Sequence, residues 1–532
     1  MMKEAERAAA AVLLLLMAAA FSCKNSRVFG KTAGSGFSRA DFPSDFVFGA
    51  GTSAYQYEGG TKEDGRAPSI WDTFASEGQI IDGSTADVAS DGYHKYKGDV
   101  KLMSETGLEG YRFSLSWSRI LPNGSGAVNP KGIQYYNNVI DELVKHGIEP
   151  HVTLCHYDFP QIFVDEYGGW LSSRMIDDFR YFADVSFKAF GDRVSHWTTL
   201  NEPNVVALYA YDYGIVPPQR CSKGSNPHGL LCKEGNSSTE PYIVAHNMIL
   251  AHSAAVEVYR SKYQAIQKGS IGINLWTLWT DPLTNSIEDE MAAQRTLDFM
   301  IGWFMDPLVF GDYPKSMKQI AGPRLPSFTE AETRKVKGAF DFIGVNYYFS
   351  LFVGNNVENL VNDQRDMSGD MLAKFTAYKE KPPIDAILPP NPLPSDPRGL
   401  PKLLKYFSDT YENPILYIQE NGYGIGGEDH LNDTKRVSYI SGFIGSTLKA
   451  LRDGSDVRGY FVWSFVDLFE LSSGFTLRIG LYHVNYNRQC ERIPKQSALW
   501  YAGFLKNNSV IKFEEESTLQ LKYPATPSIM QI

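Results

Sequence analysis

Two short segments of the chain each place one glutamate at the end of an apolar run rich in β-forming residues. The first is residues 199–203, TLNEP in one-letter code, and the second is residues 418–422, IQENG. Two carboxyl groups that reach one cleft from different strands can divide the roles of acid and nucleophile. Cleavage of an acetal, between two sugars or between a sugar and an aglycone, requires that division. The sequence therefore predicts that Glu202 and Glu420 carry the chemistry.

Eight short runs of β-branched and aromatic residues recur along the chain, with helical patterns between them. Segments such as 129–146, 173–190 and 241–262 carry apolar residues at helical spacing. Eight alternating strand and helix units predict an α/β protein that is a single (β/α)8 TIM barrel with extended βα loops. The predicted strands are 46–56, 111–117, 150–157, 196–201, 269–276, 340–348, 414–420 and 457–465.

The predicted barrel supplies a test of the site, because catalytic side chains in this fold lie at the C-terminal ends of the strands. Glu202 ends the fourth predicted strand and Glu420 ends the seventh. Any one polar residue at such a position can simply terminate a strand, but a set of them on one rim predicts an active site. The other members of the set are Gln56 on the first strand, His156 on the third, Asn346 and Tyr348 on the sixth, and Trp463 and Glu470 on and after the eighth.

The composition is that of a folded globular protein, with 43% hydrophobic and 21% charged residues. The net charge of -10 argues against a nucleic-acid partner. No linker is visible between residues 42 and 505, and the Pro-rich patch at 381–401 is expected to be a surface loop. No cofactor and no metal site are predicted, since His94, His146, His151 and His156 lack the paired spacing of metal ligands.

The N-terminus predicts a secretory signal peptide. Residues 8–21 are almost wholly apolar, yet this run is shorter than the ~20 residues of a membrane span. We expect a signal peptide at 1–22, an extension at 23–41, the barrel domain at 42–505 and a tail at 506–532, with an uncleaved anchor as the alternative. The mature protein is then expected in the apoplast or the vacuole, without a membrane partner. No retention tetrapeptide ends the sequence, which disfavours the endoplasmic reticulum.

Secretory routing makes disulfides and glycans possible. Cys221 and Cys232 bracket a loop rich in Gly, Pro and Ser and are the natural disulfide pair, with two free thiols as the alternative. Cys155 and Cys490 have no obvious partner. Four sequons, each a weak signal by itself, offer glycosylation sites at Asn123, Asn236, Asn432 and Asn507.

Five motifs closely resemble those of glycoside hydrolase family 1, the retaining β-glucosidases, and of its plant members in particular. The similarity extends from about residue 42 to about residue 505, with the motifs in order and at matching spacings. They are FGAGTSAYQ at 48–56, YRFSLSWSR at 111–119, TLNEP at 199–203, IQENG at 418–422 and GYFVWS at 459–464.

This resemblance implies that Glu202 is the general acid/base and that Glu420 is the nucleophile, which forms a covalent glucosyl-enzyme. A retaining mechanism needs the two carboxyl groups only ~5 Å apart. Tyr348 would donate a hydrogen bond to Glu420, Asn346 would support its strand end, and Arg112 would stabilise the anionic nucleophile. The family's sugar pocket maps onto Gln56, His156, Asn201, Trp463 and Glu470.

Three positions depart from the common family pattern. Tyr157 follows the histidine where Trp is usual, Gln419 precedes the nucleophile where Thr is usual, and Leu471 replaces a Trp that contacts the sugar. Hydrolysis of terminal, non-reducing β-D-glucosyl residues from aryl or alkyl glucosides or β-oligosaccharides is the leading hypothesis. Transfer of glucose from acyl- or aryl-glucosides to an acceptor, with the same two glutamates, is the alternative. A catalytically inactive sugar-binding protein is a third reading, which the presence of both glutamates disfavours. The oligomeric state is left open.

Overall fold

The computed structural model describes residues 36–223, 232–357, 365–379, 396–424 and 431–506. The predicted signal peptide at 1–22, residues 23–35 of the extension, residues 507–532 of the tail and the sequon at Asn507 lie outside these ranges. Most of the Pro-rich patch, residues 380–395, also lies outside them.

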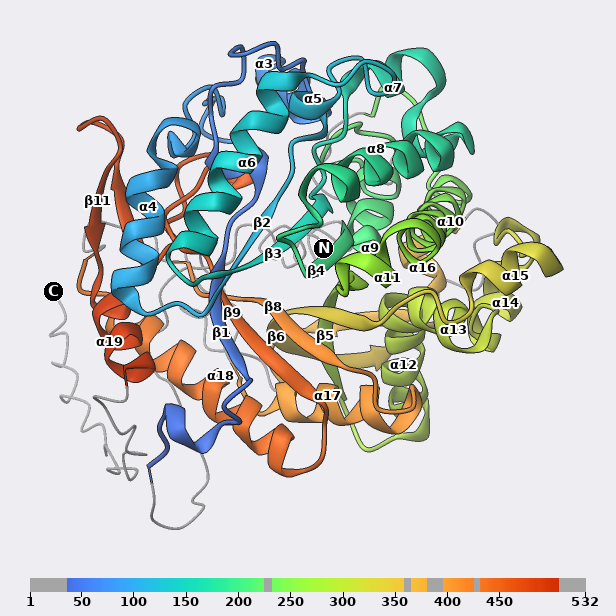
Figure 1. The fold of residues 1–532 in the computed structure, drawn as a ribbon. Coiled ribbons are helices and arrows are strands. Elements are labelled where there is room, and N and C mark those ends of the chain that lie inside the picture. The colour runs from blue at the N-terminus through green and yellow to red at the C-terminus, as the bar shows by residue number, and fades with distance from the viewer. Residues whose placement is uncertain (1–35, 224–231, 358–364, 380–395, 425–430, 507–532) are drawn as a thin grey trace, which may run out of the picture.

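The core is a closed barrel of eight parallel strands, which confirms the predicted (β/α)8 fold (Figure 1). Neighbours around the barrel run β1-β2-β3-β4-β5-β6-β8-β9, and β9 pairs with β1 to close it. The barrel strands are β1 Val47–Gly51, β2 Gly110–Ser114, β3 Glu149–Cys155, β4 His196–Asn201, β5 Ser270–Pro282, β6 Phe342–Asn355, β8 Leu416–Asn421 and β9 Val457–Trp463.

Three further strands lie outside the barrel. β7 (Ala373–Thr376) pairs antiparallel with the end of β6, while β10 (Tyr482–Asn485) and β11 (Glu491–Pro494) form a hairpin.

Helices fill the connections between the barrel strands and surround them (Figure 1). The α-helices are α2 Ala54–Tyr57, α3 Ile70–Ser76, α4 Gly92–Thr106, α5 Trp117–Ile120, α6 Pro130–Lys145, α7 Gln161–Tyr167, α8 Arg174–Phe190, α9 Pro203–Val205, α10 Glu240–Val258, α11 Gln264–Gln267, α12 Ile287–Leu297, α13 Trp303–Phe310, α14 Lys315–Ala321, α15 Glu330–Val336, α16 Met367–Asp370, α17 Gly399–Thr410, α18 Thr434–Arg452 and α19 Gln496–Leu505. Short 3-10 or π segments are η1 Arg39–Asp41, η2 Gly169–Leu171, η3 Val206–Ala210, η4 Tyr259–Tyr263, η5 Asp298–Gly302, η6 Gly322–Arg324 and η9 Leu471–Ser473.

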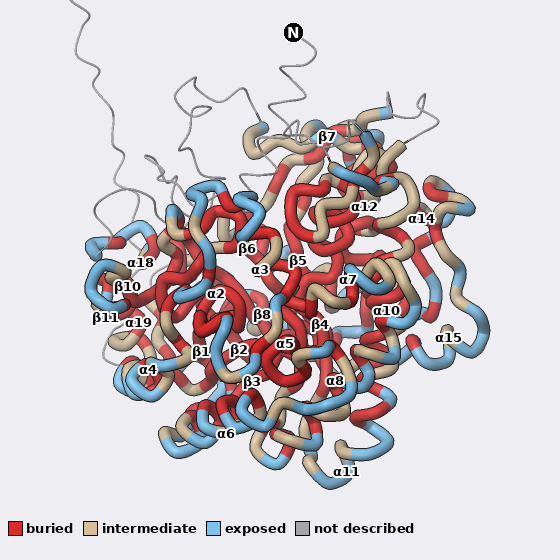
Figure 2. Tube along the Cα trace, turned by 90° about the horizontal axis from the view of Figure 1, so that it is seen from above, coloured by how far each residue is buried: buried red, intermediate tan, exposed pale blue. Residues whose placement is uncertain are grey.

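Burial follows the period of each element. The barrel strands are buried along nearly their whole length, because each lies between the barrel interior and the helical layer. The helices bury one face only, as on α6, where Tyr136, Val139, Ile140 and Leu143 are buried. Figure 2 shows this division, with buried backbone in red at the centre and exposed backbone in pale blue on the outer turns.

Several predicted strand ends were wrong. The first strand ends at Gly51, and Gln56 lies on the short helix α2, which begins directly after the extended residue Ser53. β5 and β6 run beyond the barrel and stay paired as far as Pro282 and Val353. The ladder between them is irregular where it leaves the barrel, and Tyr348 lies at this irregularity.

The packed chain also begins before the predicted boundary at residue 42. Phe37 is buried and packs against Phe504 near the end of the barrel domain. The Arg39 side chain donates to the Glu109 carboxylate at 3.0 Å and to the Phe46 carbonyl at 2.8 Å. The Pro-rich patch at 381–401 was predicted to be a surface loop. Its last three residues, 399–401, instead begin helix α17.

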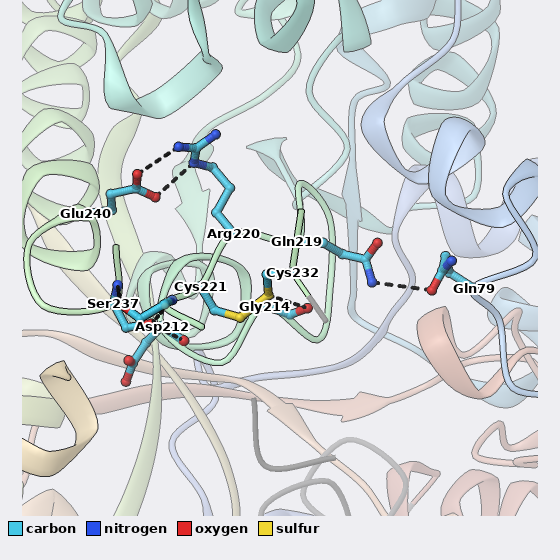
Figure 3. The surroundings of a disulfide bond; sticks show 10 residues. Gln79, Asp212, Gly214, Gln219, Arg220, Cys221, Cys232, Ser237 and Glu240 are labelled. Carbon is cyan, nitrogen blue, oxygen red and sulfur yellow. Dashed lines mark hydrogen bonds and ion pairs between the residues drawn. A yellow bond between two sulfur atoms is a disulfide. The ribbon is translucent and has the colours of Figure 1, made fainter. Parts of the chain in front are cut away.

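A disulfide joins Cys221 to Cys232 (Figure 3), while Cys155 and Cys490 are free and buried. Arg220, next to the disulfide, contacts two helical segments. It pairs with Glu240 at the start of α10, at 2.7 and 2.8 Å, and its backbone N–H donates to the Ala210 carbonyl. Arg220 therefore supports the end of η3, which follows α9.

Candidate active site

Glu202 and Glu420 face one cavity at the C-terminal ends of the barrel strands. Their exposed fractions are only 6% and 3%. The cavity is lined by Gln56, His156, Tyr157, Glu202, Val205, Tyr209, Trp276, Tyr348, Phe349, Glu420, Gly422, Tyr423, Gly424, Tyr439, Trp463, Glu470, Leu471, Leu477 and Ile479. The predicted pair of carboxyl groups is thus brought together from β4 and β8.

Local backbone geometry directs Glu202 into the cavity. It directly follows β4 with φ +45°, a left-handed conformation that a residue before proline rarely adopts. Its backbone N–H donates to the Asn274 carbonyl on β5 at 3.0 Å, which holds the turn. Glu420 needs no such turn, because it lies within β8.

Glu420 is surrounded by donors that stabilise a negative charge. Arg112 Nη1 lies 2.5 Å from Glu420 Oε1, and the Tyr348 hydroxyl donates to Oε2 at 2.6 Å. The other guanidinium nitrogen, Nη2, donates to Asn201 Oδ1 at 2.6 Å. Arg112 thus bridges one carboxylate, Glu420, and one amide, Asn201. These contacts suit a nucleophile that must be ionised.

The surroundings of Glu202 favour the protonated form. Burial raises the pKa of Glu202 to about 8, and the nearby charge of Glu420 acts in the same direction. Hydrogen bonds from Tyr157 and Asn346 oppose this rise in pKa. Asn346 Nδ2 donates to Glu202 Oε1 at 2.6 Å, and the Tyr157 hydroxyl donates to Oε2. Glu202 can therefore hold a proton at neutral pH and release it to a leaving group.

The predicted sugar-binding residues form a connected set around the two carboxyl groups. Asn201 Nδ2 donates to His156 Nε2 at 3.2 Å, and the His156 ring stacks on Trp463 with centroids 5.5 Å apart. Gln56 Nε2 donates to Glu470 Oε2 at 3.2 Å. Enclosure raises the pKa of Glu470 to about 8, with further contributions from Glu420 and Glu202. Amide, imidazole, carboxyl and indole groups at one point suit the hydroxyls and the apolar face of a sugar.

Part of the cavity lining is apolar and aromatic. Trp276, Phe349, Leu471, Leu477 and Ile479 are among its lining residues. Among the described lining residues there is no lysine and no arginine. This part of the cavity suits an uncharged group with apolar surface.

Three polar residues near the site were not assigned a role from the sequence. Tyr157 and Gln419 had been noted only as departures from a pattern, and Asn274 is a lone amide within the apolar run of β5. Asn274 Nδ2 donates to Asn346 Oδ1 at 2.7 Å and to Gln419 Oε1 at 2.9 Å. A buried amide in a hydrophobic strand was the one signal that could have indicated this network.

A second charged cluster lies at the opposite, N-terminal end of the strands. Glu149, His151 and His196 place possible ligand atoms within 4.8 Å of one another. The two imidazole rings stack with centroids 4.3 Å apart and planes 11° from parallel. Because histidine binds a metal in the plane of its ring, stacked rings cannot both point at one ion. The cluster therefore supports the barrel, and in it His196 Nδ1 lies 2.8 Å from Glu149 Oε1.

Comparison with known proteins gives the chain a family. The model of glycosyl hydrolase family 1 matches residues 38–510. The chain belongs to this family. The protein is accordingly a glycoside hydrolase, and its two glutamates lie where the family motifs predicted them.

Relatives within glycosyl hydrolase family 1 match over most of their length. "Beta-glucosidase 2" of Oryza sativa subsp. japonica is 57% identical over 473 residues, which are 88% of this chain and 93% of the relative. A protein of Delphinium grandiflorum named cyanidin 3-O-glucoside 7-O-glucosyltransferase (acyl-glucose) is 52% identical over 480 residues, 90% of this chain and 92% of the relative. A solved structure of a rice β-glucosidase mutant in a covalent complex with glucose matches with a TM-score of 0.85 and 44% identity. It covers 88% of this chain and 99% of that one.

No helix in the described part of the chain has both the length and the apolar character needed to cross a membrane.

Proposed function

We propose that this family 1 enzyme is a retaining β-glucosidase that hydrolyses terminal, non-reducing β-D-glucosyl residues of small glucosides or β-oligosaccharides. One observation carries the proposal: two buried carboxyl groups face one cavity in opposite surroundings. Glu420 contacts a guanidinium and a hydroxyl, whereas burial and a neighbouring carboxylate raise the pKa of Glu202 to about 8. One is suited to attack as an anion and the other to donate a proton.

In the first step, a Glu420 oxygen attacks the anomeric carbon of the bound glucoside. The bond between that carbon and the glycosidic oxygen breaks, and the Glu202 proton passes to the leaving oxygen. Arg112 and Tyr348 hold the Glu420 carboxylate in place until it forms the bond to the anomeric carbon and loses its charge.

In the second step, water attacks the same carbon and Glu202 takes the proton from the water. The bond to Glu420 breaks, and glucose leaves with net retention of configuration. While Glu420 is esterified it carries no charge, so its contribution to the raised pKa of Glu202 disappears. The pKa of Glu202 therefore falls when the residue must act as a base.

Trapping of the covalent intermediate tests this proposal. Glu420→Gln should abolish labelling by a 2-fluoro glucoside, measured as a mass increase of the intact protein, because an amide does not form the ester. The matched control is Glu149→Gln at the far end of the barrel, which should label like the unmodified enzyme. Labelling of Glu420→Gln at the normal rate would refute the assignment of the nucleophile.

A second candidate function is transfer of glucose to an acceptor other than water. It is supported by the Delphinium relative, whose name includes glucosyltransferase and acyl-glucose, and by the apolar wall of Leu471, Leu477 and Ile479. Both reactions pass through one glucosyl-enzyme and differ in the molecule that attacks it. Product analysis with an aryl glucoside and added alcohols, phenols or carboxylic acids separates them. Glucose release that no acceptor diverts would exclude the transferase.

We also propose that the protein passes through the secretory pathway to the apoplast or the vacuole. The apolar N-terminal run and the disulfide between Cys221 and Cys232 support this route. The sequon residues Asn123, Asn236 and Asn432 are exposed and accessible to glycosylation. Mass spectrometry of the protein purified from its native tissue, before and after deglycosylation, would test both the glycans and the cleavage near residue 22. The acidic net charge supports the expectation that no nucleic acid is bound.

A further inference from the structure

The two oxygens of the Glu202 carboxyl group have chemically different partners. Oε1 accepts from Asn346 Nδ2 at 2.6 Å, and Oε2 accepts from the Tyr157 hydroxyl. An amide N–H can only donate, whereas a hydroxyl can donate or accept. Oε1 and Oε2 are therefore unequal sites for the proton that Glu202 must carry as an acid.

The orientation of the Asn346 amide is set by a residue that cannot accept hydrogen bonds. Arg112 donates to Asn201 at 2.6 Å, so the contacted atom of Asn201 must be its oxygen, Oδ1. Asn346 reaches the same oxygen at 3.2 Å, so the contacting atom of Asn346 must be its nitrogen, Nδ2. That nitrogen is the atom that also faces Glu202 Oε1.

A second chain of hydrogen bonds supports the same orientation from the other side of Asn346. Its oxygen, Oδ1, accepts from Asn274 Nδ2 at 2.7 Å. Asn274 Nδ2 also donates to Gln419 Oε1 at 2.9 Å, and Gln419 Nε2 contacts Thr198 Oγ1 at 2.8 Å. All four amide or hydroxyl groups are buried. An inverted Asn346 would present its oxygen to a carboxylate and its nitrogen to another nitrogen, so it is disfavoured on both sides.

Tyr157 has a different kind of freedom. It is partly exposed, lines the sugar cavity, and also borders a smaller apolar cavity lined by Trp71, Phe159 and Trp170 among others. Its φ of +72° is unusual for a tyrosine, and the side chain comes directly after His156 at the end of β3. The hydroxyl can keep its hydrogen bond when Glu202 is ionised and turn away or accept when Glu202 is protonated.

We propose that Asn346 keeps Glu202 Oε1 as a permanent acceptor, that the catalytic proton resides on Oε2, and that Tyr157 is a positioning residue that controls how readily Oε2 takes this proton. The inference rests on the proposed role of Glu202 as acid/base. It assigns Tyr157 a function that differs from sugar contact, and it gives the Gln419–Asn274 pair the task of holding Asn346 in its donating orientation.

The proposal fixes the direction of a pH effect. The Tyr157 hydrogen bond favours ionised Glu202 and so lowers its pKa, against the rise caused by burial and by Glu420. Activity on a glucoside with a poor leaving group is lost as the pH rises through the pKa of the acid. Removal of the hydroxyl should therefore move this alkaline limb to higher pH. A hydrogen bond to a charged group is worth about 1.5 kcal/mol or more, which corresponds to a shift of about one pH unit.

The experiment is the pH profile of kcat/KM for Tyr157→Phe on an alkyl glucoside. We expect an alkaline limb about one pH unit higher than in the unmodified enzyme. The matched control is Tyr348→Phe, which loses a hydroxyl on Glu420 within the same cavity and should leave the alkaline limb in place. An alkaline limb of Tyr157→Phe that stays in place or moves down would overturn the proposal, because a tyrosine that only fills space has no effect on the pH profile.

Two further measurements separate this inference from the proposed function. Glu202→Gln should eliminate the alkaline limb, and Tyr157→Phe should still be labelled at Glu420 by a 2-fluoro glucoside. If Glu202→Gln keeps the alkaline limb, the role of Glu202 as acid is wrong. If Glu202→Gln loses it but Tyr157→Phe leaves it unchanged, only the role of Tyr157 is wrong.

Discussion

The two ends of the barrel hold carboxyl groups whose pKa values are moved in opposite directions. At the C-terminal end, burial raises the pKa of Glu202, and its charged neighbour is a second carboxylate. At the N-terminal end, burial also acts upward on Glu149, but hydrogen bonds and charge from His151 and His196 lower its pKa below the ordinary value. Desolvation is common to both ends, so the neighbours decide the sign.

This difference separates a site for chemistry from a site for stability. The carboxylate of Glu149 is paired within the protein, with Ser195 Oγ at 3.0 Å and His196 Nδ1 at 2.8 Å. These contacts occupy the carboxylate, so it is not available to a substrate. Glu202 and Glu470 both have pKa values raised to about 8 in a cavity that a neutral sugar can enter. A carboxyl group with a raised pKa beside a cavity is the feature that marks this end as the candidate catalytic site.

The largest effect should come from Glu202→Gln, which removes the proton donor. We expect a loss of about 10²- to 10⁴-fold in kcat/KM on glucosides with poor leaving groups, and a much smaller loss on activated aryl glucosides that need no proton. The matched control is Glu470→Gln. The pKa of Glu470 is also raised to about 8, but the carboxyl group of Glu470 contacts Gln56. The loss in this control variant should not depend on the leaving group. Equal losses of Glu202→Gln on both substrate classes would contradict the assignment.

An intermediate effect is expected from Arg112→Lys at the same end of the barrel. The guanidinium uses two nitrogens to contact Glu420 and Asn201, which an ammonium on a flexible stem cannot reproduce. We expect kcat to fall by about 10- to 100-fold, the worth of one hydrogen bond to a charged group. The rate of labelling by a 2-fluoro glucoside should fall in parallel.

Arg119→Lys provides the control for that variant. Arg119 is also buried and pairs with a glutamate, Glu58, at 3.1 Å, but its other hydrogen bonds go to the Gly59 and Gly60 carbonyls and not to residues around Glu420. Its substitution should lower the thermal unfolding temperature and leave kcat of the folded enzyme near normal. Comparable kcat losses in the two variants would mean that Arg112 acts only through stability.

The smallest effect on activity is expected at the N-terminal end, with His151→Phe. Burial and the neighbouring His196 lower the pKa of His151 from 6.5 to about 4. The unfolded chain therefore binds a proton at a higher pH than the folded chain. The folded state loses stability as the pH falls from 6.5 to 4, by on the order of 3 kcal/mol for this group.

A phenylalanine cannot take up that proton, so His151→Phe should flatten the dependence of thermal unfolding on pH between about 6.5 and 4. Its ring can keep the tilted contact of His151 with Phe461, in which the ring centroids lie 4.7 Å apart. The value of kcat at neutral pH should not change. An unfolding temperature that falls with acid as steeply as in the unmodified enzyme would show that other groups dominate acid unfolding.

The fold and the meeting of Glu202 with Glu420 in one cavity were predictable from sequence because their signals are local. Strand and helix periods are read within one segment, and a glutamate at the end of a strand is recognised from its immediate neighbours, as at residues 199–203. The same local reading misplaced Gln56, since the turn into α2 lies within a run that alternates like a strand. It also could not show that β5 and β6 continue past the barrel rim.

The partners of each side chain were decided only by the closed barrel. Tyr157 on the β3 end meets Glu202 after β4, and Gln419 on β8 meets Asn274 on β5 and Thr198 on β4. Contacts between strands depend on their register and tilt, which no single segment encodes because barrel closure sets them jointly. The sequence by itself therefore determined the barrel and the two glutamates, while the tertiary structure decided which carboxyl group is paired with charge and which is left to carry a proton.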